Sequence, residues 1–201
     1  MTAPEVLISG KASFSQQVPY RLYRSGNEKK GPLFVYLHQD GSNIENLDLQ
    51  TQSIRTIDGY HLYIQAPFED PAGPGAEKSC HWIISNTDQT ATDAQREYVS
   101  EFIQEVIDQL LPYISGSRLV LLGWSGSVHQ VSHFCSTRPH YVNELILFDT
   151  TLDRSWWQES SGSRYAHMRV LTLTGKDARI SDKLARIIAS WLNNDQQGRP
   201  V

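Results

Sequence analysis

The sequence predicts a single α/β domain, residues 1–201, in which a mostly parallel twisted sheet carries helices on both faces. Two observations lead to this fold class. Short apolar runs alternate with helical patterns along the chain, as they do in successive βαβ units. Two of those runs, Leu33–Leu37 and Leu119–Leu122, are continuously apolar, which is typical of strands buried on both faces. With 201 residues and 39% hydrophobic content, the chain is long enough for one substantial core.

The predicted strands follow from these apolar runs in chain order. Two β-like stretches, Glu5–Ser9 and Val18–Arg24, precede any helical pattern and fit early antiparallel strands. The strands expected in the parallel part of the sheet are Leu33–Leu37, Leu62–Ile64, Leu119–Leu122, Leu145–Phe148 and Val170–Leu173.

Helix boundaries are read from capping and breaking residues. Asn43 is expected to cap a helical segment that Gly59 closes. Thr92 and Gln95 have the spacing of a capping box at the start of a long amphipathic helix that Pro112 ends. A third helix is expected from just after Ser125 to the boundary of Arg138 and Pro139, and a last one after Ser181. The segment Glu69–Thr90 has no clear period and is expected to be a long loop.

Composition excludes several classes of function. A net charge of -4 does not favour binding to nucleic acid. Two cysteines, Cys80 and Cys135, do not make a disulfide framework and are expected to be buried thiols. His129 and His133 stand four residues apart, but the residues between them include no glutamate, which the HExxH pattern of a helical zinc site requires. We therefore expect no metal and no cofactor. We see no signal peptide and no membrane-spanning stretch, and we expect a cytoplasmic protein.

One motif carries chemistry. Gly123-Trp124-Ser125-Gly126-Ser127 follows a predicted buried strand and opens a predicted helix, which is the context of a nucleophile elbow. The tight turn exposes the Ser125 hydroxyl and requires small residues two positions before and after it. Gly123 meets this requirement, and Ser127 is small enough to do so. The Gly126 N–H at the helix start would face an anion beside Ser125. The alternative is a strand–helix turn that merely needs small residues.

With this motif in place, the sequence resembles the α/β-hydrolase family, and within it small carboxylesterases and polyhydroxyalkanoate-depolymerase-like esterases. Pro32–Gly41 is similar to the family's third strand and oxyanion loop, and Tyr63–Pro67 to its fourth strand. Trp82 falls where these esterases often carry a tryptophan, and Gly175-Lys176-Asp177 resembles the acid loop after the seventh strand. The sequence after the last helix leaves no room for the family's eighth strand.

The resemblance implies roles for several residues. It makes the backbone N–H of Gln39 an oxyanion donor. The family often has glycine at this position, and the Cβ of glutamine narrows the approach to that N–H, which a glycine would leave open. It makes Asp177 the acid that orients a histidine, with Asp149 and Asp153 as alternatives. His38 is expected to anchor the loop rather than to act in catalysis.

The general base is missing from its expected place. The family order is serine, acid, histidine, but the last histidine, His167, precedes Asp177. His81 is the best candidate, because its loop follows the fourth strand and reaches the sheet edge that bears Ser125, whereas His129 should lie beside its helix. A second alternative is that another chain, either a copy of this one in a homo-oligomer or a partner protein, supplies the base. A third is that hydrolysis has been lost.

Two functions therefore remain open. The first is a serine hydrolase of the esterase or thioesterase kind, acting on a small acyl substrate. The second is a catalytically degenerate relative that binds a ligand or partner protein through the same cleft. Trp82 and Trp124 near the site, with Trp156 and Trp157 in the cap segment, would suit an apolar or aromatic ligand, while core packing is the alternative.

Overall fold

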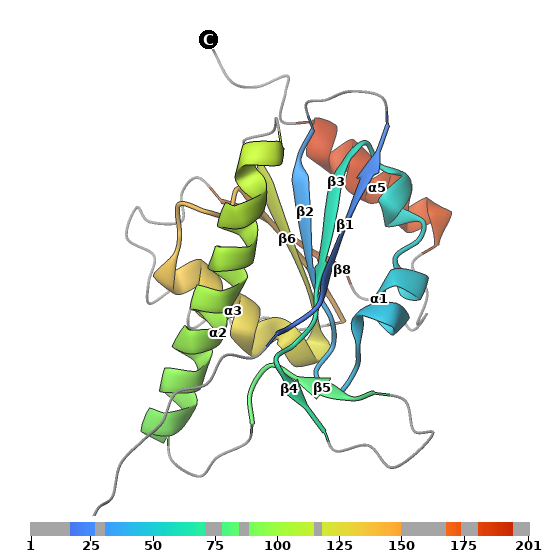
Figure 1. Ribbon diagram of the computed structural model, residues 1–201. Helices are drawn as coiled ribbons and strands as arrows, with labels where there is room; N and C mark the ends of the chain where they lie inside the picture. The colour runs from blue at the N-terminus through green and yellow to red at the C-terminus, as the bar shows by residue number, and fades with distance from the viewer. Residues whose placement is uncertain are drawn as a thin grey trace, which may run out of the picture.

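The computed structural model describes residues 17–26, 31–70, 78–84, 89–114, 118–149, 168–173 and 181–194. A six-stranded sheet lies at the centre of the molecule, with the strand order β1-β3-β2-β6-β7-β8 (Figure 1). The strands are β1 (Tyr20–Ser25), β2 (Leu33–Leu37), β3 (Gly59–Ile64), β6 (Leu119–Trp124), β7 (Glu144–Phe148) and β8 (Arg169–Leu173). Only the pairing of β1 with β3 is antiparallel among these described strands; the other pairings are parallel. The mostly parallel sheet predicted from the apolar runs is confirmed.

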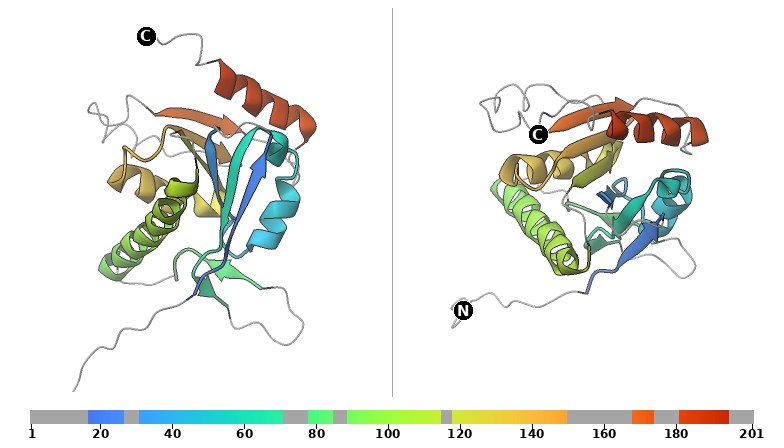
Figure 2. Two further views of the ribbon diagram at one scale, coloured as in Figure 1. Left: turned by 45° about the horizontal axis from the view of Figure 1, so that its top comes forward. Right: turned by 90° about the horizontal axis from the view of Figure 1, so that it is seen from above.

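Helices cover both faces of this sheet, as predicted (Figure 2). Helices α2 (Gln89–Leu110) and α3 (Val128–Thr137) pack on the face that presents Val35, Leu121 and Leu145. Helices α1 (Ile44–Gln50) and α5 (Asp182–Asn193) pack on the face that presents Phe34 and Val120. Strands β2, β3, β6 and β7 are buried along their whole length, which explains why the sequences of β2 and β6 show no polar alternation.

Short elements complete the described fold. Single 3₁₀ turns are η1 (Ile54–Thr56), η2 (Leu111–Tyr113) and η3 (Ser125–Ser127). A small separate hairpin pairs β4 (Phe68–Glu69) with β5 (Cys80–His81) in antiparallel fashion. Most of this hairpin falls in the segment Glu69–Thr90, which the sequence predicted to be a long loop. Strands of two residues leave no periodic pattern to detect. No strand follows β8 among the residues described up to Asn194, where α5 ends the described chain.

Two helix boundaries were predicted incorrectly. Helix α2 spans Gln89–Leu110, so Thr92 lies inside it, and Gln95 accepts a hydrogen bond from the Ile84 N–H instead of closing a capping box. Gly59 closes no helix, because α1 ends at Gln50 and Gly59 is the first residue of β3. Asn43 and Ser181 do cap helices as expected, each accepting a backbone N–H with its side chain. The predicted strand Glu5–Ser9 lies outside the described residues.

In the part of the chain that the structure describes, no helix has the length and apolar character needed to cross a membrane.

Candidate active site

Ser125 stands where strand β6 ends, at the carboxyl edge of the parallel strands. Trp124 is still extended, with φ -106° and ψ 161°, and Ser125 opens the 3₁₀ turn that leads into α3. Ser125 is exposed, although both residues before it and Ser127 after it are buried. The predicted order of strand, tight turn and helix is therefore present with an exposed serine at the turn, although Ser125 does not have the positive φ of a strained elbow.

The small residues around Ser125 make this turn possible. A Cβ added to Gly123 would lie 2.6 Å from Val131 Cγ2, closer than side chains pack, so the helix could not approach the strand. The buried Ser127 hydroxyl accepts the Trp124 N–H at 2.9 Å and lies 2.9 Å from the Trp124 carbonyl. A serine at this position therefore does more than fit: it satisfies a buried backbone donor that a glycine would leave without that partner.

The loop that follows β2, residues 38–43, lies directly against the residue after Ser125; we call it the oxyanion loop. A Cβ added to Gly126 would lie 2.8 Å from the Asp40 backbone nitrogen and 3.3 Å from Gln39 Cγ. The parallel register that pairs Leu37 with Gly123 explains this contact, because it brings the ends of β2 and β6 to the same level. Within the described residues, neither the Gln39 N–H nor the Asp40 N–H donates to a backbone carbonyl. Gln39 and Asp40 thus lie against Gly126, the residue that follows Ser125 in the chain.

His38 anchors the oxyanion loop from inside the protein. It is fully buried, its Nδ1 donates to the Gln39 carbonyl at 2.7 Å, and its Nε2 accepts the Ala66 N–H at 3.0 Å. Burial lowers the pKa of His38 to about 4, so the ring is neutral, as this pattern of one donor and one acceptor requires. These contacts support the structural role expected for His38.

His81 lies between two carboxylates. Its Nδ1 is 2.9 Å from Asp40 Oδ2, and its Nε2 is 2.9 Å from Asp70 Oδ2. The hydrogen bond to Asp40 is the main cause that raises the pKa of His81 above 6.5, against the opposing effect of burial and with help from Asp70. A general base needs a neutral ring with a lone pair aimed at the serine. With both nitrogens held by carboxylates, His81 is arranged as a donor at both positions, which argues against the role of base that its loop suggested.

The other described histidines are also engaged elsewhere or exposed. His61 is buried between the Tyr36 hydroxyl at 2.8 Å and the Ile57 carbonyl at 2.9 Å. His133 Nδ1 is 3.1 Å from the Ser100 hydroxyl. His129 lies exposed on the first turn of α3. No described histidine hydrogen-bonds to Ser125, and His167 lies outside the described residues.

The catalytic acid has one described candidate. Asp177 and Asp153 lie outside the described residues. Asp149 follows β7 with φ 52°, in the left-handed region, and its N–H donates to the Leu173 carbonyl at 2.9 Å. Because the register pairs Trp124 with Phe148, Asp149 stands level with Ser125 on the neighbouring strand. A non-glycine residue held in this conformation directly beside the elbow is a feature often seen at functional sites.

The two tryptophans proposed to contact substrate are buried. Trp82 is 1% exposed and donates its Nε1–H to the His38 carbonyl at 2.7 Å. Trp124 is 8% exposed and stacks on Phe148, with ring centroids 4.5 Å apart. Both positions favour core packing, the alternative left open from the sequence; Trp156 and Trp157 lie outside the described residues. Cys80 and Cys135 are free and buried, as expected.

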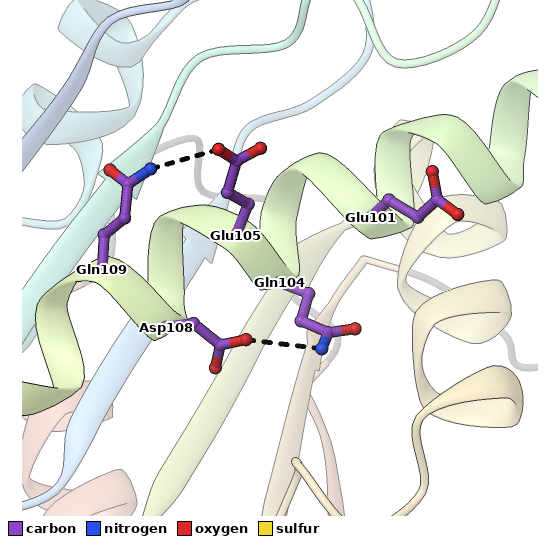
Figure 3. A pocket seen from close by; sticks show the side chains of 5 residues that line it. All are labelled: Glu101, Gln104, Glu105, Asp108 and Gln109. Carbon is purple, nitrogen blue, oxygen red and sulfur yellow. Dashed lines mark hydrogen bonds between the residues drawn. The ribbon is translucent and has the colours of Figure 1, made fainter.

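A hollow elsewhere on the surface contains none of the predicted site residues. It lies on the outer side of α2 and is lined by Glu101, Gln104, Glu105, Asp108 and Gln109, all from this one helix (Figure 3). The described part of the chain also holds no group of three or more side chains arranged to bind a metal ion.

Sequence reasoning did not find the carboxylates that hold His81. Asp40 and Asp70 are 30 residues apart in the chain, and a two-residue hairpin brings the second one to the first. One signal was available in the sequence. Asp40 follows the apolar run Leu33–Leu37 and Asp70 follows Phe68, so both stand near strand ends, where side chains from different strands converge.

Comparison with known proteins places this geometry in a fold. No family model and no curated protein matches the sequence. Among solved structures, the chain is similar to esterase PE8, with a TM-score of 0.61 and 15% identity over 88% of this chain and 98% of that one. It is also similar to a carboxylesterase from Mesorhizobium loti, with a TM-score of 0.56 and 16% identity over 87% and 94% of the two chains.

The carboxylesterase of Bacillus cereus gives a TM-score of 0.58 and 10% identity over 88% of this chain and 94% of that one. At such identities the likeness shows the fold and not the activity. The agreement extends over nearly the full length of each esterase. The chain therefore has the α/β-hydrolase fold.

Proposed function

We propose that this protein is a serine hydrolase that cleaves an ester or thioester with Ser125 as its nucleophile. The observation that carries the proposal is the meeting of three features at one sheet edge: an exposed serine on a tight strand–helix turn, the start of α3, and the backbone of the oxyanion loop against Gly126. The esterases with the same fold support this reaction class.

The proposed reaction uses these groups in turn. Ser125 Oγ attacks the acyl carbonyl carbon while its proton passes to a base, and the N–H groups of Gln39 and Gly126 hold the oxygen that becomes negatively charged. Collapse of the tetrahedral intermediate breaks the bond to the alcohol or thiol, which leaves with a proton from the protonated base. Water then attacks the acyl-enzyme by the same route and releases the acid.

An acid and a base complete the proposed machinery. Asp177 stays our candidate for the acid by its resemblance to the family's acid loop, and Asp149 is the alternative that the strand register supports. For the base, the pairing of His81 with two aspartates favours the alternative of a histidine from a second chain.

A binding protein without catalysis is the second candidate. It is favoured by the observation that, of the histidines that the structure describes, none hydrogen-bonds to Ser125. A serine without a base is a weak nucleophile, because its hydroxyl is almost wholly protonated at neutral pH. Such a protein would keep the fold and the loop geometry and bind an acyl ligand without cleaving it.

Reaction with a fluorophosphonate, followed by intact mass, distinguishes the two functions. We expect one adduct on the wild type and none on Ser125→Ala, while Ser132→Ala, a matched change on the neighbouring helix α3, should label like the wild type. Even without a fully placed base, the oxyanion hole and binding retain roughly 10³–10⁴-fold catalysis over water, so labelling should be measurable. No adduct on the wild type after many hours would reject the hydrolase and favour the binding protein.

A further variant tests the loop beside the serine. Gly126→Ala should slow labelling by roughly tenfold to a thousandfold, because its methyl group would push the Asp40 backbone away from Ser125. An adduct that persists in Ser125→Ala would show that a different serine is the nucleophile.

A further inference from the structure

A short segment, residues 78–82, holds the oxyanion loop along most of its length. The Gly41 N–H donates to the Cys80 carbonyl at 3.0 Å, and the Cys80 N–H donates to the Ser42 carbonyl at 2.9 Å. Farther along, the Asn43 side chain donates to the Lys78 carbonyl at 2.8 Å. These bonds join the loop to strand β5 as a short antiparallel ladder, at the end of the molecule where β4 and β5 lie in Figure 1.

The Asp40 side chain extends this ladder to the loop residue nearest the nucleophile. Its Oδ1 accepts the Trp82 N–H at 2.9 Å, and its Oδ2 is 2.9 Å from His81 Nδ1. The backbone nitrogen of the same residue is the atom that lies closest to the position of a Cβ on Gly126. The contacts of the Asp40 carboxylate therefore determine where the loop backbone stands relative to Ser125.

His81 can hold Asp40 and Asp70 together only in one charge state. When it is protonated, both nitrogens donate, and each carboxylate accepts a charge-assisted hydrogen bond. When it is neutral, one nitrogen has no proton and faces a carboxylate oxygen with its lone pair, so one of the two contacts becomes repulsive. Deprotonation also changes the charge of this trio from -1 to -2 next to the place where an oxyanion would form, which is unfavourable for that intermediate.

We propose that His81 is a positioning residue, not the base: in its protonated form it holds Asp40, and through Asp40 the N–H donors of the oxyanion loop, in place beside Ser125. This inference rests on the proposed hydrolase function. It assigns to His81, Asp40 and Asp70 a role in the reaction that requires no contact with substrate.

The charges that face His81 are consistent with this assignment. Asp40 reaches it from the loop after β2 and Asp70 from the end of β4, while the Ser79 hydroxyl is 3.4 Å from its Nε2. On the same hairpin, Lys78 pairs with Glu69 at 3.1 Å rather than with the trio. On α1, Glu45 pairs with Arg21.

The pH dependence follows with a definite sign. The pKa of His81 is raised, so the ring is protonated below that pKa and loses its proton as the pH rises through it. A positioning role therefore predicts that activity falls at the high-pH side. A base role predicts the reverse, because a base becomes active when it loses its proton.

The test measures the second-order rate of fluorophosphonate labelling against pH, together with the NMR titration of the His81 ring. In Asp70→Asn, the loss of one carboxylate should lower the His81 pKa, and the descending side of the rate profile should move to lower pH by the same amount. His81→Ala should label roughly tenfold to a hundredfold more slowly than the wild type at low pH, and its descending side should be gone. Glu69→Gln, which breaks an exposed ion pair on the same hairpin, is the matched control and should change neither quantity.

Two results would overturn the assignment. The first is a descending side of the labelling-rate profile that keeps its pH in Asp70→Asn although the His81 pKa measured by NMR falls. The second is labelling that rises through the His81 pKa, which would restore His81 as the base.

An independent readout separates this inference from the proposed function. The protection of the Gly41 amide against hydrogen exchange, measured without any substrate, should fall in His81→Ala and stay unchanged in Glu69→Gln. If the wild type forms no adduct but the protection of Gly41 falls in His81→Ala, the hydrolase is rejected while the positioning of the oxyanion loop by His81 is supported. Unchanged protection in His81→Ala would reject this positioning role, whatever the labelling shows.

Discussion

A buried histidine is compatible with this fold only while it is uncharged. His38 and His61 are both fully buried, and burial lowers the pKa of each to about 4. Each ring uses one nitrogen as donor and the other as acceptor, toward the Gln39 carbonyl and the Ala66 N–H in one case and toward Ile57 and Tyr36 in the other. On His38 a second proton would face the Ala66 N–H and turn an accepted hydrogen bond into a repulsive contact between two donors.

Acid should therefore weaken the fold before the carboxylates titrate. Between pH 6.5 and pH 5 the unfolded chain takes up protons on both histidines and the folded chain does not, so the free energy of unfolding should fall with pH, by about 2–3 kcal/mol over this window. His81 acts in the opposite direction, since its pKa is raised. Urea unfolding at several pH values measures the slope.

One variant assigns part of this slope. His61 stacks on Phe34 with ring centroids 4.7 Å apart, so His61→Phe replaces it with a ring of suitable shape that cannot titrate. About half of the slope should disappear, whatever the variant costs in absolute stability. A free energy of unfolding that stays flat from pH 6.5 to pH 5 in the wild type would show that both rings accept protons in the folded state.

At the scale of elements, helix α5 is attached to the sheet through a buried carboxylate. Glu144, at the start of β7, has a side chain only 3% exposed and accepts the Arg118 Nε–H at 2.7 Å. The same arginine donates to the Leu192 carbonyl at 3.0 Å, and Arg169 donates to the Trp191 carbonyl at 2.6 Å. Two cations thus meet the carbonyl end of α5, where the helix dipole favours positive charge, and Glu144 orients the first of them.

Removing this carboxylate should loosen α5. Glu144→Ala leaves the Arg118 guanidinium without its buried partner, and we expect a loss of about 2–4 kcal/mol in the free energy of unfolding. Glu105→Ala, on the exposed side of α2 in Figure 3, is the control and should stay within about 0.5 kcal/mol of the wild type. Chemical denaturation of the three proteins measures both, and equal stability of Glu144→Ala and the wild type would contradict the proposed attachment.

The elements that could be predicted from sequence are those whose pattern arises from their own burial. Leu33–Leu37 and Leu119–Leu122 are apolar throughout because both faces of these strands are covered. Thr92 misled the prediction, because its spacing to Gln95 suits a cap while the side chain of Gln95 is used by Ile84 in another segment. The hairpin of β4 and β5 could not be predicted, since four residues held by contacts with the oxyanion loop carry no periodicity of their own.

The same distinction applies to the candidate site. The tight turn at Ser125 could be predicted because it shows as a local pattern of small residues between a strand and a helix. The pairing of His81 with Asp40 and Asp70 depends on tertiary contacts across 41 and 11 positions of sequence, and no local pattern encodes it. For that reason the sequence indicated that His81 reaches the right edge of the sheet but not that its nitrogens are held by carboxylates.

At the scale of the whole molecule, the sheet separates two apolar cores. One lies under α2 and α3 and contains both Cys80 and Cys135; the other lies under α1 and α5. Cys135 stands on α3 in the middle of the first core, whereas Cys80 belongs to β5 and pairs with Ser42 of the oxyanion loop. The two thiols thus occupy one core but depend on different parts of the fold for their protection.

Because of this placement, the reactivity of Cys80 reports the separation of β5 from the oxyanion loop, and the reactivity of Cys135 reports the unfolding of the core. Burial raises the pKa of both, that of Cys135 to about 12, so a disulfide reagent such as Ellman's reagent must wait for the protein to open. Cys80 needs only the separation of β5 from the loop, while Cys135 needs the core itself to unfold. We expect Cys80 to react at least about tenfold faster, with little dependence on low urea, and Cys135 to follow global unfolding. Equal rates would mean that the hairpin and the core open as one unit. Unequal rates would show that β5 separates from the oxyanion loop while the core stays folded, and a Cys80 rate that no longer rises with reagent concentration would give the lifetime of the closed loop without any substrate.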